Sequence, residues 1–109
     1  MIKIKMIPIE TILEMSVNNE PFKLVEVLSE DDYKKGHILG AINIPLDKIE
    51  KKASDQLQKN ETIVVYCGSY SCGASTKAAK KLTAMDYAKV LDFKASKKGW
   101  VDAGFPLIS

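Results

Sequence analysis

Two cysteines, Cys67 and Cys72, have the residue type and the placement to do chemistry. Cys67 ends the apolar run IVVYC, the loop GSYSCG follows, and an Ala-rich segment with helical periodicity begins near Ala74. Loop amides that curl into a helix N-terminus bind anions and favour a thiolate over a thiol. An ordinary cysteine, with a pKa of ~8.5, is only about 3% thiolate at pH 7. We therefore expect this loop to lower the pKa of Cys67 and make it a nucleophile, the alternative being a buried Cys that closes an apolar strand.

The spacing of the second cysteine predicts a supporting role. Cys72 follows Cys67 by five residues, close enough in a curled loop to attack a persulfide or sulfenic acid there. The products would be a disulfide and sulfide or water, so Cys72 is a candidate resolving thiol; the alternative is a small residue facing a neighbouring turn. Two thiols and the distant His37 lack the paired spacing of a zinc site, so we expect no metal.

Two other chemistries of such a loop are disfavoured by missing side chains. The segment from Gly68 to Ser75 is one residue from the nucleotide-binding pattern G-x-x-x-x-G-K-[ST], but Ala74 stands in place of the phosphate-binding Lys. Cysteine-dependent phosphatases clamp three equatorial oxygens, normally with a loop Arg. All 16 basic residues of this chain are Lys.

Alternating strands and helices must position the two thiols. Apolar runs and alternation predict strands over 2–7, 22–28, 41–44, 63–66 and 89–93, and helical spacing predicts helices over 9–17 and 74–85. This order predicts a small three-layer α/β domain, with a mainly parallel five-stranded sheet flanked by helices. Ligands bind beyond the carboxyl ends of strands in such sheets, which is where Cys67 lies.

Composition sets the outer limits. A chain of 109 residues with 46% hydrophobic and 28% charged residues forms one globular domain, 1–109. A net charge of +2 without a dense basic run predicts neither a nucleic-acid nor a membrane partner, and nothing in the sequence specifies an oligomeric state. The N-terminal segment alternates Lys with Ile, unlike a signal peptide, so we expect a cytoplasmic protein.

Four blocks of the sequence resemble the rhodanese domains, over roughly residues 22–108. The strongest is GHILGAINIP at 36–45, close to the family's G-H-I-x-G-A-x-N-I-P. It is joined, in the family's order, by LVEVLSEDDY, by IVVYC and by the ending GWVDAGFPL.

The resemblance implies a small parallel α/β fold and a catalytic cysteine, matched here by Cys67, that carries transferable sulfur as a persulfide. The substrates would be a small sulfur donor, thiosulfate or a low-molecular-weight persulfide, and a thiol or cyanide-like acceptor, with a protein as a further candidate acceptor; no cofactor is implied. The anionic sulfur would be held by the active-site loop, formed by Gly68, Ser69, Tyr70, Ser71, Gly73, Ala74 and Ser75.

Departures from the family pattern refine this expectation. The family's C-R-x-G-x-R-S loop is here CGSYSCGAS, two residues longer and without Arg, which predicts poor use of thiosulfate. The usual Asp and Arg of D-V-R are Glu26 and Leu28, so a familiar ion pair is expected to be missing and Glu26 to be structural or to accept hydrogen bonds near the loop. We expect His37 to hold backbone through its ring nitrogens.

Two other classes of function remain open at this stage. One is a non-catalytic binding module of the same fold, in which the cysteine is incidental. The other is a thiol redox enzyme that uses Cys67 and Cys72 together, which is distinguished by turnover that needs both thiols.

Overall fold

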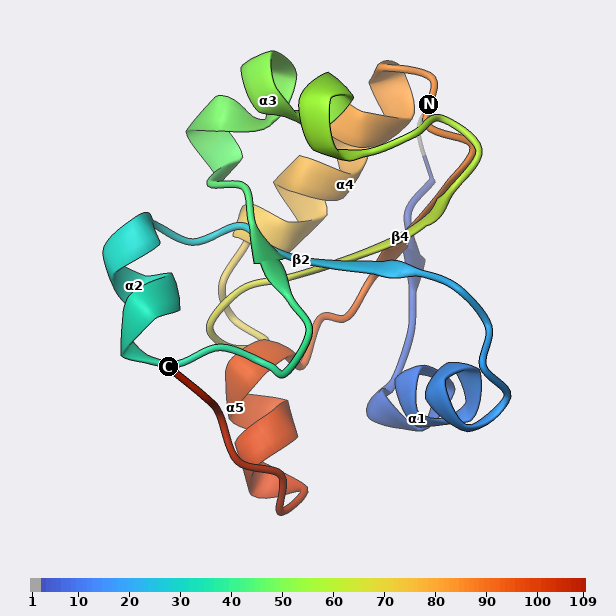
Figure 1. Ribbon diagram of the computed structural model, residues 1–109. Helices are drawn as coiled ribbons and strands as arrows, with labels where there is room; N and C mark the ends of the chain where they lie inside the picture. The colour runs from blue at the N-terminus through green and yellow to red at the C-terminus, as the bar shows by residue number, and fades with distance from the viewer. Residues whose placement is uncertain (1–2) are drawn as a thin grey trace.

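A five-stranded sheet forms the centre of the molecule in the computed structural model, which describes residues 3–109 (Figure 1). All neighbouring strands are parallel, and their order is β1-β5-β4-β2-β3. The strands are β1 (Lys5–Met6), β2 (Lys23–Glu26), β3 (Ile42–Asn43), β4 (Thr62–Tyr66) and β5 (Lys89–Asp92). The predicted sheet is confirmed, although the two edge strands pair over only two residues each. Residue 2 of the first predicted strand lies outside the described residues.

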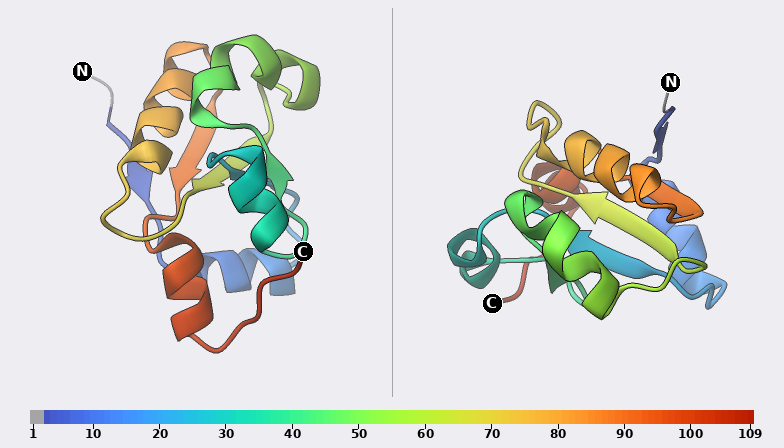
Figure 2. Two further views of the ribbon diagram at one scale, coloured as in Figure 1. Left: turned by 90° about the vertical axis from the view of Figure 1, so that its left-hand side faces the viewer. Right: turned by 90° about the horizontal axis from the view of Figure 1, so that it is seen from above.

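Helices cover both faces of this sheet and complete the predicted three layers (Figure 2). One face carries α3 and α4, and the other carries α1 and α5, while α2 follows directly after the carboxyl end of β2. The helices are α1 (Ile9–Val17), α2 (Glu30–Lys35), α3 (Ile49–Gln56), α4 (Ala74–Ala84) and α5 (Ser96–Asp102), with a 3₁₀ turn at Leu46–Lys48. None of the helices among residues 3–109 is both long and apolar enough to span a membrane.

Side-chain alternation along the central strand divides the core in two. Ile63 and Val65 of β4 face the core under α3 and α4, whereas Val64 and Tyr66 face the core under α1 and α5. Cys67 continues the first series and packs in the same core as Ala78 and Leu82 of α4, so its side chain points into the protein.

Three short helices were not predicted from helical spacing, because they present little or no apolar face. The helix α2 has no buried residue and begins at Ser29, whose Oγ accepts a hydrogen bond from the Asp32 N–H at 3.2 Å. That Ser-x-x-Asp pattern is a helix-start signal that the sequence does contain. The helix matters for function because it forms one wall of the site described next.

Candidate active site

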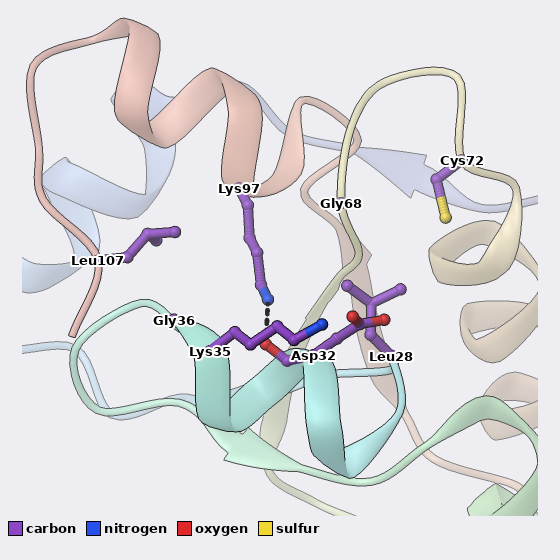
Figure 3. Close-up of a pocket in the computed structure, with 8 residues that line it drawn as sticks. All are labelled: Leu28, Asp32, Lys35, Gly36, Gly68, Cys72, Lys97 and Leu107. Atoms are coloured by element: carbon purple, nitrogen blue, oxygen red, sulfur yellow. Dashed lines mark hydrogen bonds between the residues drawn. The ribbon is translucent and has the colours of Figure 1, made fainter. Parts of the chain in front are cut away.

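A cleft of about 450 Å³ opens beyond the carboxyl ends of β2 and β4, where ligands bind in parallel sheets (Figure 3). Its walls come from five parts of the chain: the end of β2, the helix α2, the loop after β4, the start of α5 and the C-terminal segment. The lining residues are Leu28, Asp32, Lys35, Gly36, Gly68, Cys72, Lys97 and Leu107.

Cys67 lies beneath this cleft with none of its surface exposed. Its backbone N–H donates to Ser96 Oγ at 2.9 Å, and its carbonyl accepts from the Lys97 N–H at 3.2 Å. Its thiol donates to the Cys72 carbonyl at 3.3 Å. The backbone of Cys67 is therefore held by the start of α5, and its sulfur is covered by the loop.

The electrostatic surroundings of Cys67 differ from the sequence-based expectation. Burial raises the pKa of the Cys67 thiol, and the hydrogen bond with the Cys72 thiol raises that pKa further. The amide and hydroxyl of Ser75 and the hydroxyl of Ser96 favour the thiolate but do not outweigh burial. The prediction of a lowered pKa at Cys67 is wrong, because β4 carries this side chain into the apolar core.

The anion-stabilising groups of the loop surround Cys72 instead. Partial burial would raise the pKa of Cys72, but the Cys67 thiol, the amides of Ala74 and Gly68 and the charge of Lys94 together lower it. The loop amides that were predicted to favour a thiolate therefore lower the pKa of Cys72, whereas burial outweighs them at Cys67. Both cysteines are free thiols.

The outer part of the loop, residues 69–71, is not among the residues that line the cleft. Tyr70 is 67% exposed, with the Lys94 ammonium 5.4 Å from its ring centroid, and the hydroxyls of Ser69 and Ser71 lie 3.1 Å apart. Gly73 precedes α4, and its carbonyl accepts the Lys77 N–H at 3.1 Å. Of the predicted loop residues, Gly68 and Cys72 line the cleft, while Ala74 and Ser75 supply amides to the thiols.

Glu26 forms an ion pair with Lys97, a different partner from the family's Arg, whose position is occupied by Leu28. Its carboxylate is fully buried, accepts a hydrogen bond from Tyr66 Oη at 2.8 Å through Oε1, and lies 2.9 Å from Lys97 Nζ through Oε2. Lys97 Nζ also donates to the Asp32 carbonyl at 3.1 Å, which ties α5 to α2 across the cleft (Figure 3). Lys97 therefore supplies the positive charge that pairs with the buried Glu26 carboxylate, and no sequence pattern marked it for this role.

His37 has the backbone-holding geometry that was expected of it. Its Nδ1 lies 2.9 Å from the Tyr33 carbonyl, and its ring stacks on that of Tyr33 with centroids 3.8 Å apart. Its backbone exchanges two hydrogen bonds with Ile108, at 2.7 and 2.9 Å, which brings the C-terminal segment beside α2.

Ser96 is a further residue of the site that sequence reasoning did not assign. It is fully buried and has a φ of +60°, a left-handed conformation that non-glycine residues rarely adopt. Its Oγ accepts from the Cys67 N–H and lies 3.1 Å from the Phe93 carbonyl and 3.8 Å from Cys67 Sγ. Such strain is kept where the surroundings require it, here at the backbone that supports Cys67.

Comparison with known proteins agrees with this fold. The model of the family described as "Rhodanese-like domain" matches residues 10–103. The chain is 28% identical over 94 residues to "Putative sulfur carrier protein YrkF" of Bacillus subtilis (strain 168), covering 86% of this chain and 49% of that protein. It is 34% identical over 68 residues to "Thiosulfate sulfurtransferase PspE" of Escherichia coli (strain K12), covering 61% and 62%.

Solved structures show the same architecture. The crystal structure of the BH2092 protein from Bacillus halodurans superposes with a TM-score of 0.87 at 25% identity, covering 96% of this chain and 77% of that one. This chain belongs to the rhodanese-like domain family. It spans about half the length of YrkF and less than two thirds of PspE, two of the curated relatives that it matches.

Proposed function

We propose that this protein transfers sulfane sulfur as a cysteine persulfide, as a sulfurtransferase or a persulfide carrier, with Cys67 as the residue that holds the transferred sulfur. The observation that carries the proposal is the pair of free cysteines at the carboxyl end of β4 and beside a cleft, with the Cys67 thiol hydrogen-bonded to the Cys72 carbonyl at 3.3 Å. Cys67 follows β4, where the resemblance to the rhodanese domains implies a catalytic cysteine. The names of YrkF and PspE support the same chemistry.

The reaction is a double displacement. A protein thiolate attacks the outer sulfur of the donor, the S–S bond of the donor breaks, and the donor remainder leaves with the electron pair of that bond. A second thiolate, from the acceptor, then attacks the outer sulfur of the protein persulfide and releases the cysteine. Both thiols must stay reduced, which suits a reducing compartment such as the cytoplasm.

The cleft favours an organic persulfide as the donor. Its volume of about 450 Å³ is within the ~300–1,000 Å³ of pockets that hold organic ligands, and Leu28 and Leu107 give it apolar walls. Of its lysines, Lys97 is paired with Glu26, and the chain has no Arg to bind sulfonate oxygens in a bidentate way.

The test is the intact mass of the protein after incubation with glutathione persulfide. We expect a gain of one sulfur atom that dithiothreitol removes, and transfer of that sulfur to cyanide or a thiol. The double variant Cys67→Ser/Cys72→Ser is the matched control and should gain nothing. If the wild-type protein gains no sulfur and both thiols still react with a thiol reagent, the proposal is wrong, and the domain is better explained as a non-catalytic binding module.

The position of two free cysteines in one turn of the loop also supports a second candidate function, a thiol redox enzyme. In that case the protein would reduce a disulfide substrate that carries no sulfane sulfur, with formation of the Cys67–Cys72 disulfide and loss of activity in either single variant. Turnover of such a substrate, set against turnover of glutathione persulfide, separates the two activities.

A further inference from the structure

The cleft meets the second cysteine of the loop and not the first. Cys72 lines the cleft and is partly exposed, whereas Cys67 is fully buried beneath the loop. Figure 3 shows Cys72 on the part of the loop that leads into α4, across the cleft from Asp32 and Lys35 of α2. A donor bound among these walls therefore reaches the sulfur of Cys72 first.

The loop backbone covers the sulfur of Cys67. Its Sγ lies 3.3 Å from the Cys72 carbonyl and 3.9 Å from the Ser69 carbonyl. That turn is closed by the Cys72 N–H, which donates to the Ser69 carbonyl at 3.1 Å, and by Lys94 Nζ, which donates to the Cys72 carbonyl at 2.9 Å. Attack requires reacting atoms about 3–3.5 Å apart and aligned, so a donor can approach Cys67 directly only if this turn opens.

The surroundings of Cys72 are suited to a nucleophilic thiolate. The amides of Gly68 and Ala74 favour its thiolate, and so does the charge of Lys94, whose ammonium is held at the Cys72 carbonyl at 2.9 Å. The lowered pKa of Cys72, set against the raised pKa of Cys67, agrees with the difference in access.

On the basis of the sulfur transfer proposed above, we infer that Cys72 is the catalytic residue that first accepts sulfane sulfur from a donor in the cleft, and that it passes this sulfur inward to Cys67. Cys67 Sγ lies 3.3 Å from the Cys72 carbonyl, so the second step joins two residues that are neighbours within one turn of the loop. This order is the reverse of the one in which Cys72 only resolves a persulfide on Cys67.

Both steps balance without an oxidant or a reductant. In the first, the Cys72 thiolate attacks the outer sulfur of R–S–SH, the donor S–S bond breaks, and R–S⁻ leaves, so Cys72 becomes a persulfide. In the second, Cys67 attacks the outer sulfur, the bond from Cys72 Sγ to that sulfur breaks, and the proton of the Cys67 thiol moves to Cys72 Sγ. The products are a Cys67 persulfide and a Cys72 thiol, with the hydroxyls of Ser75 and Ser96 as neighbours of the new persulfide.

Rapid mixing with excess glutathione persulfide, quenched by alkylation and followed by peptide mass spectrometry, tests this order. In the wild type the extra sulfur should appear on Cys72 before Cys67. Cys67→Ser should still load and should keep the sulfur on Cys72. Cys72→Ser should load Cys67 at least about tenfold more slowly, because the positioned nucleophile is lost. Cys72→Ala should behave alike, and urea unfolding midpoints near that of the wild type show that the variants are folded.

The opposite pattern overturns the inference: Cys72→Ser loads at the wild-type rate, and Cys67→Ser does not load at all. That pattern leaves the proposed sulfur transfer intact, with Cys67 as the direct acceptor. A wild type that takes up no sulfur on either thiol instead overturns the proposed function, so the two failures are distinguishable.

Discussion

The thiol of Cys67 donates a 3.3 Å hydrogen bond to the backbone carbonyl of Cys72, so the backbone of the second cysteine covers the sulfur of the first. The two thiols therefore differ in their access to the cleft. Cys72 lines the cleft with a lowered pKa, and Cys67 lies under it with a pKa that burial and the Cys72 thiol raise.

The first prediction is that iodoacetamide near pH 7 modifies Cys72 well before Cys67. A lower pKa gives more thiolate at neutral pH, and only the thiolate reacts. In Cys72→Ser, burial still raises the pKa of Cys67, so alkylation should become fast only above about pH 8.5, the ordinary pKa of a cysteine. The measurement is the pH profile of the alkylation rate in the two single cysteine variants. Overlapping profiles would contradict the assigned surroundings of the two thiols.

The second prediction uses the missing guanidinium. An added side chain at Gly68 fits, because a Cβ there meets only Leu28 Cδ1 at 3.9 Å, and Gly68 is outside the left-handed region. Gly68→Arg should raise kcat/KM for thiosulfate by about tenfold, because a bidentate donor then lines the cleft. The same variant should change kcat/KM for glutathione persulfide little. Gly68→Lys, a point charge, is the control and should gain less. Equal gains would show that charge alone limits thiosulfate.

The third prediction concerns the buried ion pair. Lys97→Met leaves the Glu26 carboxylate buried without its cation and should lower the free energy of unfolding by about 3–5 kcal/mol. The double variant Glu26→Gln/Lys97→Met should recover part of that loss, because a neutral amide oxygen still accepts from Tyr66 Oη. Urea unfolding of both variants measures the difference. A double variant no more stable than Lys97→Met would show that the lysine acts through packing.

The fourth prediction separates strain from hydrogen bonding at Ser96. Ser96→Ala removes the hydroxyl that accepts from the buried Cys67 N–H, and this loss should lower the free energy of unfolding by about 1–3 kcal/mol. The alanine still has a Cβ, so the left-handed φ remains strained. Ser96→Gly loses the same acceptor but relaxes the backbone, so it should be more stable than the alanine variant by about 1 kcal/mol. Equal unfolding midpoints would argue against strain at this position.

The sheet and the strand that carries Cys67 were predictable because their signals are local. The continuous apolar run before Cys67 and the small, regularly spaced apolar residues from Ala74 mark a buried parallel strand followed by a helix. The orientation of Cys67 was also predictable, since the alternation of Ile63 and Val65 directs its side chain toward α4, whereas the loop amides suggested an exposed thiolate.

Other features depend on contacts between distant parts of the chain. The ion pair of Glu26 with Lys97 forms only when α5 docks over the end of β2, and neither residue carries a local sign of the other. The left-handed φ of Ser96 is likewise imposed by its packing beside Cys67, since its side chain favours no such conformation. The access of Cys72 to the cleft follows from the folding of a loop longer than the family pattern.

The attachment of the end of β4 to the start of α5 has a consequence for motion. Backbone hydrogen bonds from Lys97 to Cys67 and from Lys98 to Gly68 join the first residues of the loop to the core. The Cys72 N–H instead donates its hydrogen bond to the Ser69 carbonyl, within the same turn. In native-state hydrogen exchange, the Cys67 amide should therefore open only with global unfolding, and the Cys72 amide by local fluctuation. Breathing of the turn can change access to one sulfur atom while the other keeps its place.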